Sequence, residues 1–198
     1  MAVLAGRNAD IYLATGAGTS MTGQATTALG GGVYQITLAA RRAINPNASL
    51  TVLDGVTTVS PALYQVAWGN GKIVFPNYAP AGAITVTGSF LTLSKAAQGT
   101  DWTLDITPTL EEVQVFGDAW KTRAVVQREG TCTFGRFYDD AYFVTNSASY
   151  YVIDLYADFS NTVRWRFGAS QSSVGISVGE NEIIRENVSF STIGIVDY

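Results

Sequence analysis

Hydrophobic and polar residues alternate in the middle of this chain. From Trp102 to Ile106 every second residue is apolar, and the residues between them are charged or carry a hydroxyl group. A period of two is typical of a β-strand with one buried face and one wet face. The pattern returns at residues 131–138, so both segments are predicted strands. Between them lie a polar run with two adjacent acids at residues 107–112 and a short, mostly apolar run at residues 113–116, which Gly117-Asp118 breaks.

Shorter patterns of the same kind predict strands along the rest of the chain. Turn residues mark two hairpins, because Asp54-Gly55 favours a two-residue turn and Gly69-Asn70-Gly71 favours another tight turn. A change of phase beside Gly88 predicts a β-bulge or a bend between Gly88 and Leu91. The predicted strands cover residues 10–14, 33–39, 49–53, 56–59, 64–68, 72–75, 83–94, 150–157, 163–167, 174–178 and 184–196.

Two segments predict loops. Residues 15–32 are small and rich in glycine, which indicates a mobile loop. No Gly-Lys-Ser/Thr follows these glycines, which argues against a phosphate-binding loop. Residues 41–47 contain Asn45-Pro46-Asn47, a strong turn signal.

The acids Asp139 and Asp140 favour the start of a short helix at residues 141–147, because acids are preferred in a first helical turn. About a dozen short strands with turns between them then predict the fold class. We expect residues 1–198 to form a single, mainly β domain. Its architecture is predicted to be a β-sandwich or partly closed β-barrel, with at most one short flanking helix and long loops.

Composition adds a constraint on the surface. Hydrophobic residues make up 47% of the chain but charged residues only 14%, against about 25% in ordinary soluble domains. No run approaches the ~20 apolar residues of a membrane span, and the N-terminus does not read as a signal peptide. Few charges indicate either a surface buried against other copies or partners, or a surface covered by Thr, Ser, Asn and Gln. Composition alone leaves both open.

The charge balance argues against tight nucleic-acid binding. The net charge is −4, and the 12 Lys and Arg residues are spread along the chain, with Arg41-Arg42 as the one adjacent pair. Proteins that bind nucleic acid collect such residues to neutralise phosphates.

Residues with catalytic chemistry are scarce. The chain has no histidine, which removes Ser-His-Asp and Cys-His catalysis and histidine-ligated zinc. The lone Cys132 is predicted to be a small buried side chain. Glu111-Glu112 and Asp139-Asp140 have neither the spacing of glycosidase acids nor that of a calcium loop. We therefore predict no enzymatic activity, no metal and no cofactor.

Two aromatic features have alternative interpretations. Arg164 and Arg166 flank Trp165, which suits either partners for neighbouring acids or a small nucleic-acid patch. The four tryptophans suit either core and interface anchors or a sugar-binding surface. They are Trp68, Trp102, Trp120 and Trp165.

Residues 83–198 resemble the tail tube proteins, or major tail proteins, of long-tailed bacteriophages. The shared pattern is an alternating strand with Trp, then V-x-V-F-G-D-x-W, then a strand ending in F-Y-D-D. It is carried by Trp102, Val113, Val115, Phe116, Gly117, Asp118, Trp120, Phe134, Phe137, Tyr138, Asp139 and Asp140.

The resemblance implies a structural virion protein of the phage tail, assembled in the host cytoplasm. Such subunits form hexameric rings that stack into a hollow tube and conduct DNA to the host without specific binding. The implied partners are further copies and the tape measure, tail terminator and tail tip proteins, with no membrane. The alternative is a sugar- or receptor-binding β-sandwich module on a virion, which predicts a stable monomer.

The resemblance and the loop predictions also select candidate site residues. Candidate assembly residues are Arg41, Arg42, Asn45, Pro46, Asp54, Gly55, Phe116, Asp118 and Trp120. Candidate acids facing a channel are Glu111, Glu112, Asp139 and Asp140.

Overall fold

A computed structural model describes residues 10–96, 99–113, 122–158, 163–179 and 182–197. The described residues are mostly β-strand and form two seven-stranded sheets, so the predicted mainly β class is confirmed. One short α-helix, α1 (Tyr142–Thr145), lies beside them, as predicted. Among the described residues no helix is long and apolar enough to cross a membrane.

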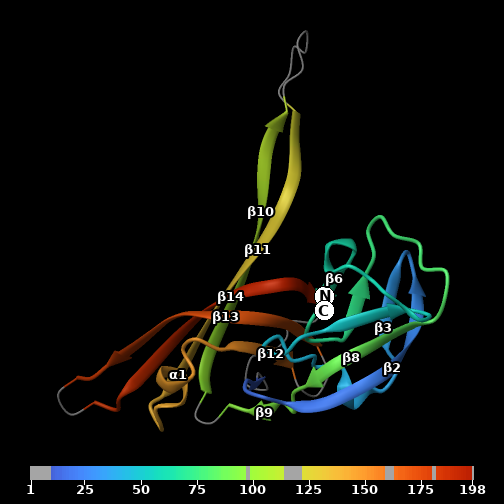
Figure 1. The fold of residues 1–198 in the computed structure, drawn as a ribbon. Helices are drawn as coiled ribbons and strands as arrows, with labels where there is room; N and C mark the ends of the chain where they lie inside the picture. Colours follow the sequence, from blue (N-terminus) through green and yellow to red (C-terminus); the bar gives the residue numbers. More distant parts are fainter. Residues whose placement is uncertain (1–9, 97–98, 114–121, 159–162, 180–181, 198) are drawn as a thin grey trace.

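The first sheet is antiparallel throughout and has the strand order β10-β11-β14-β13-β12-β1-β9. Figure 1 shows β13 and β14 running across the body of the molecule, with α1 beneath them. Its strands are β1 (Asp10–Ala14), β9 (Ser94–Lys95), β10 (Gly99–Val113), β11 (Thr122–Phe137), β12 (Tyr150–Asp158), β13 (Val163–Ser177) and β14 (Arg185–Asp197).

The second sheet is built from the first half of the chain and has the order β5-β4-β8-β2-β3-β7-β6. Two 3-10 turns, η2 (Ala39–Arg41) and η3 (Pro61–Leu63), connect parts of it. Its strands are β2 (Thr19–Gly30), β3 (Val33–Ile36), β4 (Thr51–Asp54), β5 (Thr57–Thr58), β6 (Gln65–Ala67), β7 (Lys72–Val74) and β8 (Ile84–Phe90).

Each sheet has its own hydrophobic core, and β12 helps to join them. Tyr151, Ile153 and Leu155 of β12 belong to the core of the first sheet, together with Phe143 from α1. Val152, on the opposite face, packs with Ala14 at the end of β1 and with Ala43 and Leu91, which lie in segments that flank strands of the second sheet. From Tyr151 to Tyr156 both faces of this strand are therefore buried.

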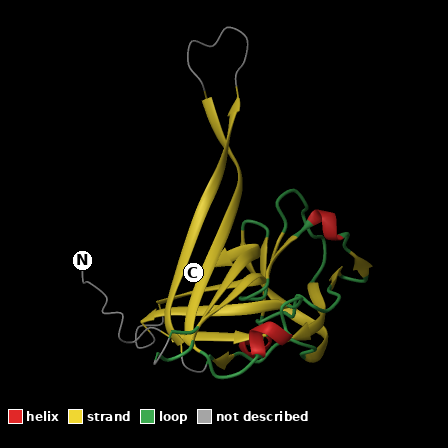
Figure 2. Cartoon of the chain, turned by 90° about the vertical axis from the view of Figure 1, so that its left-hand side faces the viewer, coloured by secondary structure: helices red, strands yellow, loops and turns green. Residues whose placement is uncertain are grey.

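The strands β10 and β11 form a ribbon that leaves the body of the molecule (Figures 1 and 2). β11 pairs with β14 only from Thr131 to Phe137, whereas its remaining residues, 122–130, pair with β10 alone. The polar run at residues 107–112 lies within this ribbon, because β10 continues through it to Val113.

The predicted loop at residues 15–32 was also wrong over Thr19–Gly30, which form β2. This strand pairs with β8 on one side and β3 on the other, and its Met21 is buried. Its threonines, alanines and glycines carry little apolar surface, so the alternation is weak although the backbone pairs with β8 over its first half and with β3 over its second.

The two predicted hairpins are confirmed as β4–β5 and β6–β7. The predicted change of phase near Gly88 is seen as a shift in the buried positions of β8, from Ile84 and Val86 to Ser89. The register irregularity itself lies opposite, between Met21 and Gln24 of β2. The predicted strands 163–167 and 174–178 are one continuous strand, β13.

Candidate assembly surfaces

Within the described ranges, the part of the ribbon beyond Ile106 and Gly130 is a two-stranded structure without a third strand. Thr107–Val113 would span about 23 Å at the usual strand rise of ~3.3 Å per residue. An isolated two-stranded hairpin is only marginally stable in water, and its outer edges offer unpaired backbone groups. Ile106 and Leu110 are also about half exposed on β10. The ribbon therefore has the features of a surface that is covered in an assembly.

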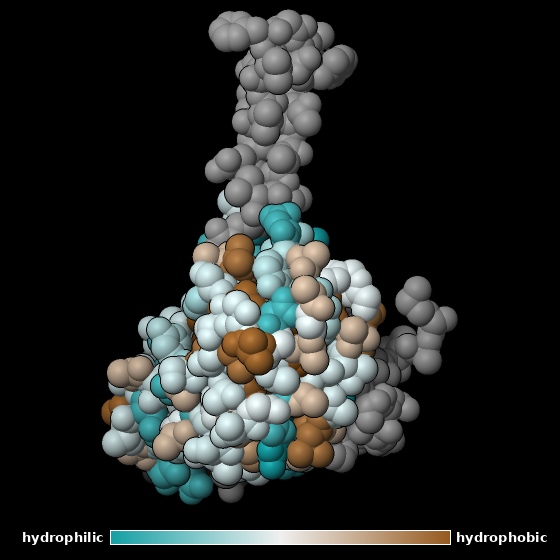
Figure 3. Space-filling model, turned by 45° about the vertical axis from the view of Figure 1, so that its right-hand side comes forward, coloured by the Kyte–Doolittle hydropathy of each residue, from teal (hydrophilic) through white to brown (hydrophobic). Residues whose placement is uncertain are grey.

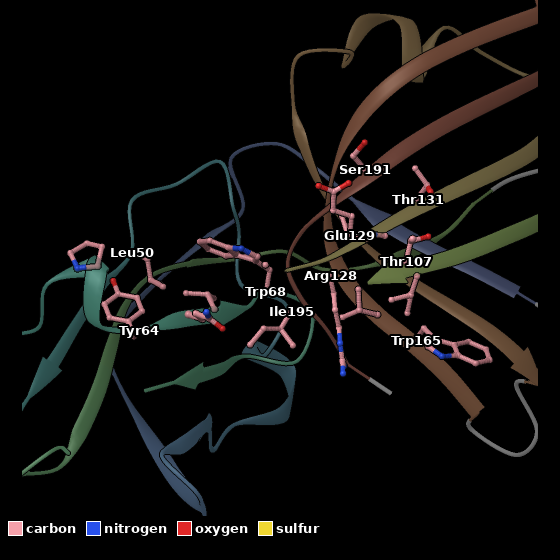
Figure 4. Close-up of a pocket in the computed structure, with 18 residues that line it drawn as sticks. Leu50, Tyr64, Trp68, Thr107, Arg128, Glu129, Thr131, Trp165, Ser191 and Ile195 are labelled. Carbon is pink, nitrogen blue, oxygen red and sulfur yellow. Dashed lines mark hydrogen bonds between the residues drawn. The ribbon is translucent and has the colours of Figure 1, made fainter. Parts of the chain in front are cut away.

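A groove of about 1300 Å³ lies at the root of this ribbon. Figure 4 shows its two walls: Leu50, Tyr64 and Trp68 from the second sheet face Trp165 and Thr107 from the first. Ile106 and Ile195 add apolar surface, and Arg128 and Glu129 add charge. We call this hollow the root groove.

Glycines set the depth of the root groove. Gly194 has a φ of +70°, and a Cβ at this position would overlap the backbone oxygen of Val66. A Cβ at Gly168 would lie 2.9 Å from Cδ1 of Trp68. Both positions need glycine because β6 and Trp68 lie directly against β13 and β14. The aromatic wall is thereby held against the end of the first sheet.

The loop of residues 41–47 is fastened to the body by Asn45, whose side chain is buried. Its Nδ2 donates to the backbone oxygens of Gly16 and Ala17, each at 2.8 Å, and its Oδ1 accepts from the backbone N–H of Asn47 at 3.0 Å. Pro46 follows it and is half-buried. Asn45 thus ties this loop to the residues that precede β2.

We expect Asn45→Ala to lower the free energy of unfolding by about 1–3 kcal/mol, because it removes the hydrogen bonds that the buried Asn45 amide makes to the backbone. Urea denaturation measures this. Arg41→Ala in the same loop is the matched control. The guanidinium carbon of Arg41 lies 5.7 Å from the centre of the Phe90 ring, and its loss should cost about 0.5–1 kcal/mol. Equal effects would contradict the role of the buried amide.

The neighbouring candidate residues are bound within the chain. Nε of Arg42 donates to the oxygen of Ile36 at 2.9 Å. Asp54 accepts from the hydroxyl of Tyr78 at 2.7 Å and from the backbone N–H of Ala81 at 2.9 Å. The Tyr78 hydrogen bond lowers the pKa of Asp54, with help from the backbone N–H groups.

Gly55 has a φ of +60°, and Val56 beside it is 98% exposed at the tip of the β4–β5 hairpin. An assembly role for Arg41, Arg42, Asn45, Pro46, Asp54 and Gly55 stays a prediction.

The two pairs of adjacent acids lie in different parts of the structure. Glu111 and Glu112 pair through their backbones with Ala124 and Arg123 in the ribbon. Asp139 is exposed, whereas Oδ1 of Asp140 accepts from Nη2 of Arg136 at 2.9 Å. This hydrogen bond is the main cause that lowers the pKa of Asp140. Phe116, Asp118 and Trp120 lie outside the described residues.

Other sequence interpretations are tested by contacts in the first sheet. Arg164 and Arg166 both pair with the buried Asp154, which confirms that they are partners for a neighbouring acid. Cys132 is buried, as predicted, and this burial raises the pKa of its thiol to about 12. Among the described residues no cluster of metal-binding side chains is found.

No protein-family model and no curated protein matches the chain. Among solved structures it is similar to the tail of an empty gene transfer agent (GTA) particle of C6 symmetry. The identity is 8%, the match covers 54% of this chain and 85% of that chain, and the TM-score is 0.46. It is also similar to a chain in the virion of a native GTA particle, with 10% identity, coverage of 52% and 86%, and a TM-score of 0.45. At these values the likeness assigns neither a family nor a function.

Proposed function

We propose that this protein is a structural subunit of a hollow phage tail tube, in which hexameric rings stack and conduct DNA to the host. The observation that carries the proposal is the ribbon of β10 and β11, which extends from the body and has no third strand among the described residues. A monomer would leave its backbone edges and its exposed apolar residues in water. Further copies of the same chain would cover them. The resemblance of residues 83–198 to tail tube proteins supports the same function.

Ring and tube formation fit the symmetry of such surfaces. A ring needs one head-to-tail contact that closes, and stacking needs a second contact that continues. The ribbon and the root groove are two different surfaces, and they supply the two kinds of contact that a tube requires. The low share of charged residues, 14%, also fits a chain with much of its surface buried in an assembly. Figure 3 shows small apolar patches on a face whose residues are mostly pale, between strongly apolar and strongly hydrophilic.

The channel would be lined by acids and small polar residues, so that DNA phosphates pass without binding. Glu111, Glu112 and Asp139 are the candidates that keep this role in the proposal. Asp140 is a weaker candidate, because its carboxylate already binds Arg136. The tape measure, tail terminator and tail tip proteins would then be the partners along and at the ends of the tube.

Electron microscopy of the concentrated, purified protein tests the proposal. We expect rings or tubes whose abundance rises with protein concentration. Analytical ultracentrifugation over the same range provides an independent measure of mass. A protein that stays monomeric at high concentration, with or without purified tail components, would contradict the function as a tube subunit.

The second candidate function is a sugar-binding or receptor-binding module on a virion. The root groove favours it, since Tyr64, Trp68 and Trp165 line the hollow and aromatic faces suit sugars. This function predicts a stable monomer that binds a glycan. The same microscopy therefore separates it from the tube subunit.

A further inference from the structure

On the face of the first sheet that carries its hydrophobic core, three successive rows of side chains cross β11, β14 and β13 toward one end of these strands. In the first row Phe134, Val188 and Val174 lie side by side on β11, β14 and β13, and the first two are buried. These apolar side chains form part of the hydrophobic core of the sheet. In the next row the core gives way to charged side chains.

The second row holds Arg136 opposite Glu186, with Ile176 beside them on β13. Nε of Arg136 donates to Oε2 of Glu186 at 2.5 Å, and both side chains are buried. Ile176 is 49% exposed. The hydrophobic core therefore stops at this ion pair.

The third row is apolar again, although it lies beyond the ion pair. The backbone N–H of Tyr138 donates to the oxygen of Ile184 at 2.9 Å, which extends the pairing of β11 and β14 by one step. Val178 stands one residue past the end of β13. These three side chains are 36%, 37% and 68% exposed, respectively. We call them the tip row. They continue the alternation of the core positions, yet all three side chains are exposed to solvent.

The root groove is a hollow large enough to receive side chains of another chain. Its volume of about 1300 Å³ exceeds the ~300–1000 Å³ of common small-molecule pockets, so a protein segment fills it better than a small ligand. Aromatic and aliphatic side chains form its walls, and Arg128 and Glu129 supply charge. An apolar centre with a polar rim is the usual anatomy of a protein interface.

The two surfaces lie at opposite ends of the same strands. Ile184 precedes β14, and Ile195 of the root groove lies near its other end, about 35 Å away at ~3.3 Å per residue. One copy cannot bring them together. Contact between two copies would join different surfaces, which is the head-to-tail type that builds rings or filaments.

The charges beside the two surfaces are also complementary. Glu182 and Arg185 are exposed next to the tip row, and Arg128 and Glu129 lie at the root groove. Each surface therefore carries one acid and one base that the other can pair. We propose that the tip row of one copy seats in the root groove of the next copy. This inference rests on the proposed function and names the contact through which its subunits would join.

Disulfide trapping tests the contact directly. Chains carrying Val178→Cys are mixed with chains carrying Ile195→Cys, allowed to assemble, and oxidised. We expect a linked dimer in the mixture and in neither variant alone. Leu29→Cys replaces Val178→Cys in the matched control, because Leu29 is 53% exposed and belongs to neither surface. The buried Cys132 keeps its proton at neutral pH and stays out of the reaction.

Charge reversal gives a second test. We expect Arg128→Glu and Glu182→Arg each to raise the concentration needed for assembly about two- to fivefold, as fits an exposed ion pair. A chain with both changes should assemble as the wild type does. Restored assembly in the double variant would show that the single changes remove an ion pair between copies. If the single changes damaged the fold instead, the double variant would not recover.

The outcomes separate this inference from the proposed function. Rings or tubes of wild-type chains without a link between positions 178 and 195 overturn the inference alone and leave the groove to another occupant, such as a glycan. A link no stronger than that of the Leu29→Cys control does the same. A wild-type protein that never assembles overturns both.

Discussion

A chain in which Asn-Gly replaces residues 110–126 is expected to keep its folded body and to lose assembly. The change removes most of the free ribbon and retains the pair Thr109↔Gln127. Asn-Gly is the dipeptide that best closes a two-residue hairpin. We expect the concentration needed for rings or tubes to rise at least ~100-fold, the effect of losing about 2.7 kcal/mol per contact. Electron microscopy and sedimentation over a concentration series measure it.

The same variant distinguishes assembly from folding. Within the described part of the chain, residues 122–130 pair through their backbones with β10 alone, and Gly130, which bonds Thr192 of β14, is retained in the variant, so the thermal midpoint should stay within a few degrees of the wild type. The replaced segment includes Glu111, Glu112, Phe116, Asp118 and Trp120. Tubes at wild-type concentrations would show that neither the ribbon nor these residues hold the assembly together. A large loss of thermal stability would show instead that the ribbon supports the body.

Sequence patterns located the strands that have one buried face. Alternation predicted β1 and much of β14, and turn residues predicted both hairpins of the second sheet. In the strands, a core on one side of the sheet imposes a period of two on the apolar residues. In the hairpins, the turn conformation requires glycine. These constraints act on neighbouring residues, so a single sequence records them.

The ribbon was missed for the opposite reason. Among the described residues no core cluster lies against its free part, so nothing imposes alternation on residues 107–112, which are polar in composition. β2 was missed because its small side chains carry little apolar surface. The resemblance of the central motifs to tail tube proteins did identify this region as important, although the pattern of residues did not give its length.

The candidate surfaces depend on residues that are far apart in the chain. Trp68 and Trp165 were recognised as anchors or binding residues, but their position on one groove follows from the meeting of two sheets. Val178 and Ile184 resemble core residues in the sequence, because they continue the alternation of buried strands. Only the end of the core at Arg136 and Glu186 shows that they are exposed. The charge pair itself joins residues on two strands.

That charge pair leads to the second large effect: Arg136→Met is expected to lower the free energy of unfolding by about 3–5 kcal/mol. Glu186 is fully buried, and its Oε1 has no hydrogen-bond partner among the described residues. Arg136 therefore provides the one charged partner that its Oε2 has there. Arg136 also donates to Asp140 and lies over the ring of Phe143 at 4.7 Å, so it fastens α1 to the sheet.

Two controls isolate the buried pair in chemical denaturation. Asp140→Asn removes the exposed partner alone, and a surface pair should contribute less than about 1 kcal/mol. Because the pKa of Asp140 is lowered in the folded state, its contribution is present above the unfolded pKa and is lost as the pH falls through the folded pKa. The double variant Arg136→Met with Glu186→Leu should recover most of the lost stability, since no buried charge remains unpaired. A double variant as unstable as Arg136→Met would show that packing against Phe143, rather than charge, sets the cost.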